Sequence, residues 1–565
     1  MKRCPQCNHI EKDDALAYCR ADGARLIADV DASEPNTAIL REGDGSTRTL
    51  PQGARTSSNT SSNTGPTSGP TSAELSTGQL PNVPSIAVLP FVHMSADSDN
   101  EYFCDGLAEE LLNALSKIEN LKVAARTSSF SFKGKNVNVD EIGRALHVKT
   151  VLEGSVRKSG NRLRITAQLV NAADGYHLWS ERYDREMKDV FDIQDEITLA
   201  IVDALKLRLL GDTKDEILKR HTEDSAAYQA YLEGRFYWSK RSADGLNRSI
   251  ECFNRALQID PGYALAYLGL ADAHNILGFY TIRAPKDTFP QAKAAAMKAL
   301  EIDPSLAEAQ ASLAYEQFYH EWDWAAAEST IRQAIALKPD YAMAHQYYGN
   351  FLTLLARFEE ALEEFRRNVQ LDPLSLIGNA ALGWAFYFAR KYDQSIDQLR
   401  KVIQLDHNFE LAHFWLGSVY ADAEMFTEAI QEFETAAGLS ANRVGISSSL
   451  GYVYALMGDR AKASQILSEL AQDSKRNYVS PYRVANIYTA LGDRDEAFAW
   501  LERAYDDRSH LLVFMNVDPR VDPLRDDARF VDLVRRVGLP TEAQRFVASG
   551  TDDNELSTMR LGQKN

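Results

Sequence analysis

Residues 411–440 read LAHFWLGSVYADAEMFTEAIQEFETAAGLS, and this stretch decides the fold. Its glycine belongs to a series with a constant spacing of 34 residues: Gly349, Gly383, Gly417 and Gly451. The alanines at 429 and 436 allow two helices to approach closely, and the aromatic residues fill the space beside them. A regular, all-helical period is therefore expected here.

The period extends on both sides of this stretch. Helix endings of the form A-L-x-L/I-D-P mark the earlier units, at Pro261, Pro304, Pro339 and Pro373. The first interval is 43 residues, which fits an insertion near residues 278–286. A helical period of 34 residues is the tetratricopeptide repeat, and the register gives eight repeats over residues 226–509. Residues 510–565 are then expected to form a cap on the open end of the array and a tail.

In tetratricopeptide arrays the first helix of each repeat lines a concave groove. Applying the register gives these candidate groove residues: Tyr315, Asn350, Trp384, Tyr387, Tyr452, Tyr482 and Asn486. Aromatic and amide side chains suit an extended peptide or a partner helix. The alternative is that part of this set packs between neighbouring repeats. Gln346 and Tyr482 stand where a carboxylate clamp has lysine, so such a clamp is not expected.

Residues 84–213 have a different pattern. An apolar strand at 85–91 precedes a helical pattern at 101–118, and three strand-like runs separated by hairpin signals follow after residue 148. A long amphipathic helix closes the region. Mixed helices and strands in this order predict an α/β or α+β domain.

This region resembles the TolB amino-terminal-like (FlgO-like) domain. The resemblance rests on PSIAVLPF, DNEYFCDGLAEELLNALSKI, VLEGSVRKSGNRLRITAQLV and GYHLWSERYDREMKDVFDIQDEI. It implies an α/β fold in a bacterial regulator and no catalytic residues. Output modules that accompany such domains are winged-helix domains, adenylate cyclases and protein kinases. The cluster Arg126-Thr127-Ser128-Ser129 is either a small anion pocket at a strand end or an ordinary loop.

The N-terminal 28 residues carry three of the five cysteines. Cys4 and Cys7 form a CxxC pair, Cys19 follows, and Asp22 stands where a fourth cysteine would complete a zinc ribbon. The segment resembles small zinc-ribbon modules whose second half reads C-x-x-D-G. We predict a structural zinc ion held by these four residues, with His9 or water as the alternative fourth ligand. No general base stands nearby, so catalytic zinc is not expected.

Residues 29–83 are a Ser/Thr/Asn/Gly/Pro tract with few apolar residues, which predicts a disordered linker. The net charge of −18, and 8 basic against 10 acidic residues in positions 1–85, argue against a nucleic-acid partner. No apolar run is long enough to span a membrane, and the N-terminus has no secretory pattern. A soluble, cytoplasmic protein is expected.

Phosphate-binding, kinase, serine-hydrolase and metalloprotease motifs are absent from the sequence. We therefore expect a non-enzymatic scaffold or adaptor in bacterial signalling that binds a protein partner through the repeat groove. Two alternatives stay open. The 84–213 domain could sense a small molecule, or the chain could be an accessory subunit of a cyclase- or kinase-type system.

Overall fold

The computed structural model describes residues 83–94, 101–207, 217, 219–440 and 444–540. It also describes three two-residue strands near the N-terminus, with β1 (Lys2–Arg3) pairing antiparallel to both β2 (Ile10–Glu11) and β3 (Ile27–Ala28). The predicted zinc ligands Cys4, Cys7, Cys19 and Asp22, the alternative His9, and almost all of the predicted linker lie outside the described residues.

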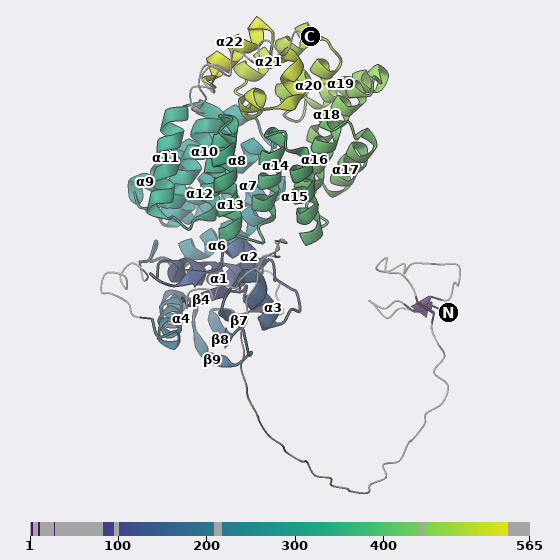
Figure 1. Cartoon of the computed structure of the whole chain (residues 1–565). Coiled ribbons are helices and arrows are strands. Elements are labelled where there is room, and N and C mark those ends of the chain that lie inside the picture. Colours follow the sequence, from purple (N-terminus) through teal and green to yellow (C-terminus); the bar gives the residue numbers. More distant parts are fainter. Residues whose placement is uncertain are drawn as a thin grey trace, which may run out of the picture. The chain divides into compact units, whose positions relative to one another are not determined.

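Residues 83–207 form an α/β region around a mixed sheet (Figure 1). The strands run in the order β6-β4-β7-β8-β9, and β5 also pairs with β7. Strand β4 is parallel to β6 and β7, whereas β7, β8 and β9 form antiparallel hairpins. The strand bounds are β4 (Ser85–Val88), β5 (Val92–His93), β6 (Lys122–Val123), β7 (Thr150–Ser159), β8 (Arg162–Asn171) and β9 (His177–Glu186).

Helices cover both faces of this sheet because side chains alternate along each strand. Ile86 and Val88 of β4 pack in one core with α1, α4 and α6, whereas Ala87 packs with Ile142 of α3 on the other face. The helix bounds are α1 (Glu101–Ser116), α2 (Arg126–Phe130), α3 (Val139–Leu146) and α4 (Val190–Ala204), with a 3-10 turn η2 (Met187–Asp189) before α4. The mixed α/β region predicted from the strand and helix patterns is confirmed.

From Ser225 onward the described chain is helical and forms a tetratricopeptide superhelix. Consecutive helices pair antiparallel, and in several pairs a glycine admits a large side chain of the partner helix; a Cβ on Gly417 would lie 3.0 Å from Phe433, and one on Gly383 would lie 2.8 Å from Leu399. The pairs are α6 (Ser225–Ser239) and α7 (Ala243–Ile259), α8 (Ala264–Phe279) and α9 (Pro285–Ile302), α10 (Ala307–Glu316) and α11 (Trp324–Leu337), α12 (Ala342–Leu354) and α13 (Phe358–Leu371), α14 (Leu376–Phe388) and α15 (Tyr392–Leu405), α16 (Glu410–Asp422) and α17 (Phe426–Leu439), α18 (Val444–Leu456) and α19 (Arg460–Asp473), and α20 (Pro481–Ala490) and α21 (Arg494–Asp506).

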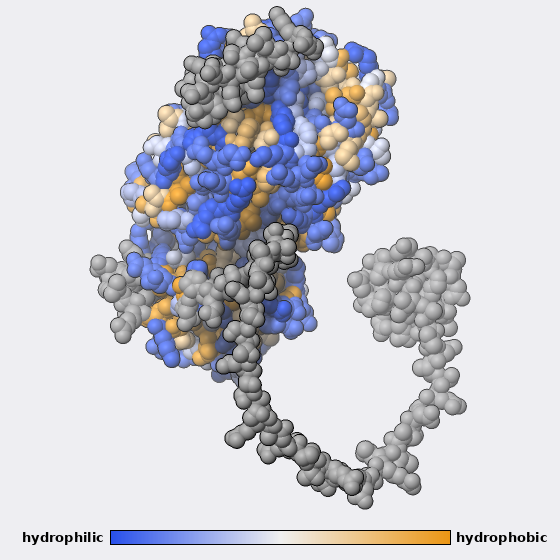
Figure 2. Space-filling view, in the orientation of Figure 1, coloured by the Kyte–Doolittle hydropathy of each residue, from blue (hydrophilic) through white to orange (hydrophobic). Residues whose placement is uncertain are grey.

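Two departures from the regular period concern the ends of helices. A π-helical turn, η3 (Gln317–Glu321), extends α10 and adds a residue to the third repeat. After α21 the chain continues as two 3-10 segments, η4 (His510–Asn516) and η5 (Pro519–Leu524), and a last helix, α22 (Ala528–Val537). On the face drawn in Figure 2 the repeats are largely hydrophilic, with smaller apolar patches between. Among the described residues no helix is long and apolar enough to cross a membrane.

Candidate functional site

The inner face of the superhelix is made by the first helices of the pairs, because α8, α10, α12, α14, α16, α18 and α20 contact one another in sequence. This concave face has two parts that differ in what covers them. We call the part that residues 510–524 of the chain itself cover the C-terminal half, and it includes surface of η3, α12, α14 and α20. We call the part that borders a cavity shared with the α/β region the N-terminal half, and it includes surface of α6 to α16, so that α12 and α14 contribute to both.

Apolar side chains of residues 510–524 pack into the C-terminal half. Phe514 stacks on Phe388 of α14, with ring centroids 5.2 Å apart, and its ring lies 6.1 Å from that of Tyr319. Leu512, Val513, Met515, Val521 and Leu524 are also buried. Burial of this many apolar side chains holds the segment in place as part of the core.

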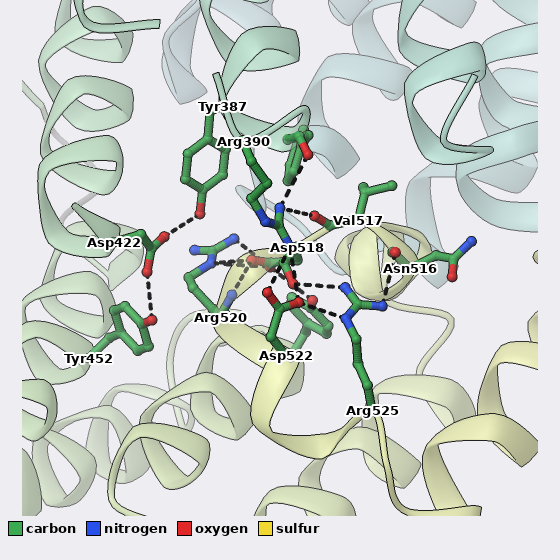
Figure 3. Close-up of polar contacts among 12 residues, drawn as sticks. Tyr387, Arg390, Asp422, Tyr452, Asn516, Val517, Asp518, Arg520, Asp522 and Arg525 are labelled. Carbon is green, nitrogen blue, oxygen red and sulfur yellow. Dashed lines mark hydrogen bonds and ion pairs between the residues drawn. The ribbon is translucent and has the colours of Figure 1, made fainter. Parts of the chain in front are cut away.

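Polar contacts fix the same segment against the inner helices (Figure 3). Tyr482 of α20 donates a hydrogen bond of 2.9 Å to Asp518 Oδ2, and Arg390 donates one of 2.6 Å to the carbonyl oxygen of Val517. Arg390 also pairs with Asp522 at 2.9 Å. Burial opposes the ionisation of Asp518, but the charge and hydrogen bonds of Arg520 outweigh it and hold the pKa of Asp518 below its ordinary value.

A second carboxylate, Asp422 of α16, joins two inner helices beside this segment. Tyr387 donates to its Oδ2 at 2.5 Å and Tyr452 donates to its Oδ1 at 2.7 Å. Burial raises the pKa of Asp422 to about 6, although Arg520 and the two hydroxyl groups oppose the rise. These tyrosine hydroxyls are therefore engaged within the chain.

The structure divides the predicted groove residues. Tyr387, Tyr452 and Tyr482 bond to Asp422 and Asp518 as described, and Asn486 and Tyr315 are also buried. Tyr315 packs against Tyr347, with centroids 4.6 Å apart. Asn350 and Trp384 are half-buried and border the cavity. The register located inward positions, but it could not show that the chain after α21 returns to cover them.

The cavity over the N-terminal half has a volume of about 1350 Å³ and reaches from α1 and residues 121–127 to the inner helices α6 to α16. Much of its wall is aromatic. Trp384 stacks on Trp415 with centroids 5.3 Å apart and planes inclined by 16°. The other aromatic residues that border it along these inner helices include Trp238, Tyr280, Tyr315 and Tyr347.

Charged side chains lie at the α1–α6 end of the cavity. Glu109 of α1 accepts hydrogen bonds of 2.7 Å from Arg126 and from Arg235 of α6. Burial disfavours the charged form of Glu109, but the two guanidinium groups outweigh it and lower its pKa to about 2. Asp272 of α8 lies 3.8 Å from Arg235, and burial raises its pKa to about 6.

The polar cluster Arg126-Thr127-Ser128-Ser129, which follows strand β6, joins the α/β region to the repeats. It forms helix α2, and both the backbone N–H and the hydroxyl of Ser128 donate to Asp372 Oδ1, at 3.0 and 2.5 Å. The backbone N–H of Leu374 donates to the Ser128 hydroxyl oxygen at 2.8 Å. The cluster is thus a helix that makes a contact between regions, a role that neither the anion-pocket nor the loop interpretation described.

Sequence reasoning also missed the cavity residues of the first repeat, Arg235, Trp238 and Arg241. The signal was present, because Gly234 stands at the glycine position of that repeat and a Cβ there would lie 2.5 Å from Phe253. Extending the groove register to this repeat would have placed Arg235 and Trp238 on the inner face.

Comparisons with known proteins match separate parts of the chain. Residues 82–200 match a HilA/YgeH-like transcriptional regulator, second domain, and residues 322–375, 380–443 and 482–506 match tetratricopeptide repeat models. A Rhizobium meliloti protein described as "Putative adenylate cyclase 3" is 43% identical over 193 residues, which are 34% of this chain and 33% of that protein. The transcriptional regulator HilA of Salmonella typhimurium is 22% identical over 311 residues, 54% of each chain. The chain thus spans between a third and about half of these relatives.

Comparisons with solved structures give low TM-scores. PilF of Pseudomonas aeruginosa is 25% identical, covers 36% of this chain and 91% of its own, and gives a TM-score of 0.28. The human IFIT1 dimer with m7Gppp-AAAA is 16% identical, covers 56% and 77%, and gives a TM-score of 0.38.

Proposed function

We propose that this protein is a non-enzymatic adaptor that binds an extended segment of a partner protein in the N-terminal half of its concave face. The observation that supports this most is the aromatic-walled cavity between the α/β region and the inner helices. Its volume exceeds the roughly 300–1,000 Å³ typical of small-molecule sites, and aromatic residues dominate the energetics of protein interfaces. Asn350 and Gln346 add amide groups that can bond a peptide backbone.

The remaining regions extend this proposal. Residues 84–213 would act as a TolB amino-terminal-like domain that closes the groove from one side, and residues 29–83 as a tether. Cys4, Cys7, Cys19 and Asp22 would hold a structural zinc ion. Metal analysis of the full chain should find about one zinc per molecule, and Cys19→Ser should lose it; equal zinc content in both would reject the site.

Site-specific photocrosslinking tests the adaptor role. A photoreactive phenylalanine analogue replaces Asn350 in the full chain, and a matched variant carries it at Lys401, which is exposed on the outer helix α15. After irradiation in lysate of the source cells, we expect a discrete adduct from position 350 and none from position 401. Failure of position 350 to form an adduct, or the same adducts from both positions, would contradict the proposal.

A ligand-sensing regulator is the second candidate, and the shared lining of the cavity favours it. A small molecule touching both α1 and the inner helices would stabilise their contact, and such coupling suits an accessory part of a cyclase-type system. The partial relatives described as an adenylate cyclase and as a transcriptional regulator are compatible with a regulatory role. A metabolite screen by thermal shift, repeated on Trp384→Ala, distinguishes this candidate: a ligand must raise the melting temperature of the wild type more than that of the variant.

A further inference from the structure

Three hydrogen-bond donor groups at the α1–α6 end of the cavity have no acceptor among the described residues. The Nε1 atom of Trp238 and the Nε atom of Arg235 are buried without a hydrogen-bond partner. The guanidinium group of Arg241 makes no ion pair with any described carboxylate, and its packing partner is the Trp238 ring. Buried donors are nearly always satisfied in proteins. Of these three groups, the guanidinium group of Arg241, a half-buried residue in the cavity wall, is the one that a ligand in the cavity can reach.

These donors are close together in the cavity wall. The guanidinium carbon of Arg241 lies 3.8 Å from the centroid of the Trp238 ring, and that of Arg235 lies 4.6 Å from the same centroid. All three residues border the cavity. A ligand at this corner could accept hydrogen bonds from the guanidinium group of Arg241, with that of Arg235 nearby, and charge-assisted hydrogen bonds of this kind are stronger than neutral ones.

The charges at this corner do not balance. Glu109 is shared between Arg126 and Arg235, and Asp272 lies 3.8 Å from Arg235. Glu110, next to Glu109 on α1, is a third carboxyl group at this end of the cavity, and burial raises its pKa to about 7, so it is only partly ionised near neutral pH. Arg241 is then a third cation against two carboxylates and one partly protonated carboxyl group. The small excess of positive charge matches a singly charged anion better than a doubly charged phosphate.

Aromatic surface adjoins the same corner. Burial raises the pKa values of the phenols of Tyr280, Tyr315 and Tyr347, and the positive charge of Arg241 opposes each rise. Arg241 and these three tyrosines border the same cavity. Beyond them, Trp384 and Trp415 continue the aromatic wall. A ligand that places its anion beside Arg241 would lay its apolar groups along these rings.

We infer that the corner formed by Arg235, Trp238 and Arg241 binds a carboxylate of the partner segment. Aromatic or leucine side chains beside that carboxylate pack on the rings of Tyr280, Tyr315 and Tyr347. This inference rests on the proposed adaptor function and specifies its ligand as an acidic, aromatic peptide. A single Asp or Glu side chain supplies the required single negative charge. Ordered water is the competing occupant, and it would give no preference for acidic peptides.

The test uses two pools of capped octapeptides that differ at one position. Each pool has aromatic residues or leucine around a fixed central residue, Asp in one pool and Asn in the other. The full-length protein is immobilised, and the retained peptides are quantified by mass spectrometry. We expect about tenfold enrichment of the Asp pool, the effect of one net charge-assisted hydrogen bond.

Variants identify the residue responsible. Arg241→Gln should remove the preference for the Asp pool, and Arg241→Lys should retain part of it. Arg248→Gln is the matched control, because Arg248 is exposed on α7, lies over the ring of Tyr237 and does not border the cavity. Asp272→Asn should increase the preference, since it removes a competing negative charge while it can keep the hydrogen bond with Ser312. This gain is measurable even if Arg241→Gln fails to fold.

The outcomes separate the carboxylate site from the adaptor function. A preference for the Asp pool that survives Arg241→Gln would overturn the inference, as would equal retention of both pools. If position 350 still forms its crosslinked adduct in either case, the adaptor function stands without the carboxylate site. If neither pool is retained and no adduct forms, both fall. A preference lost in Arg241→Gln, kept in Arg248→Gln and raised in Asp272→Asn supports the carboxylate site.

Discussion

The two halves of the concave face are built from the same helical repeat, but they have different surroundings. In the C-terminal half, Phe514 and Asp518 of the returning segment bind the inner helices through stacking and hydrogen bonds. In the N-terminal half, Trp384 and Asn350 border a cavity of about 1350 Å³. Repeat geometry therefore fixes which side chains face inward, whereas the segment that follows the repeats determines which of them remain open to a partner.

The largest expected effect is on the stability of the C-terminal half of the concave face, which residues 510–524 cover. Asp518→Asn removes the carboxylate that faces Arg520, whose side chain is 14% exposed and whose guanidinium lies 2.8 Å away. An unpaired buried charge of this kind costs about 3–5 kcal/mol in free energy of unfolding. Urea denaturation should show this loss, with hydrogen exchange localising it to α18–α21. Asp272→Asn, in the N-terminal half, is the comparison. An equal loss in the free energy of unfolding of that variant would remove the distinction between the halves.

Removal of the main apolar contact should have a somewhat smaller effect. Phe514→Ala leaves a cavity beside Phe388 and Tyr319, and a buried phenylalanine truncated in this way costs about 3 kcal/mol. Asn350→Ala, in the N-terminal half, should change the free energy of unfolding by less than about 0.5 kcal/mol. A negligible effect of Phe514→Ala in urea would mean that the segment is not part of the core.

The pH dependence of stability provides a third comparison. The folded-state pKa of Asp422 is raised to about 6, so the folded state holds its proton more tightly than the unfolded state does. This contribution to stability is present below pH 4 and is lost as pH rises from about 4 to 6. Asp422→Asn should therefore gain about 2 kcal/mol relative to the wild type across that window.

Melting curves at pH 4, 5, 6 and 7 measure this difference directly. The control is Asp397→Asn, on the exposed side of α15, which should follow the wild type at every pH. A difference between Asp422→Asn and the wild type that stays constant with pH would show that burial does not raise the pKa of this carboxyl group.

The smallest effect on stability is expected in the N-terminal half of the concave face. Arg241→Gln removes the contact with the Trp238 ring and a longer-range attraction to Asp272, so its cost should be below about 1 kcal/mol. Its effect should instead appear in peptide binding. A loss of stability as large as that of Asp518→Asn would show that Arg241 holds the fold together and is not reserved for a ligand.

The period and the domain classes could be predicted because they are local properties of the sequence. The 34-residue glycine spacing and the strand–hairpin pattern after residue 148 required no knowledge of distant contacts. The covering of the groove depends on a long-range contact between residues 510–524 and helices α14 to α20. Only composition hinted at it, because HLLVFMNVDPRVDPL has apolar residues and two Asp-Pro turns that a simple tail would not need.

The interface between the α/β region and the repeats could not be predicted from the sequence either. Ser128 and Asp372 are 244 residues apart in sequence, and neither lies in a motif that indicates pairing. The cavity exists because this contact and the Glu109–Arg235 pair join α1 and α2 to the inner helices. Site prediction from one repeat register therefore located Trp384 and Asn350 but not the charged corner.

Hydrogen exchange of the full-length protein tests the central claim most directly, because it measures both halves in one experiment. The amides of Val517 and Asp518 donate to the carbonyl oxygen of Phe514 within the packed segment, and the amide of Leu512 donates to that of Ser509 just before it. We predict that residues 510–524 exchange as slowly as α20 and α21 whether or not a partner is present, while addition of the crosslinked partner slows exchange in α12 and α14. Rapid exchange of residues 510–524, or their release when the partner binds, would contradict the account and move the binding site to the C-terminal half.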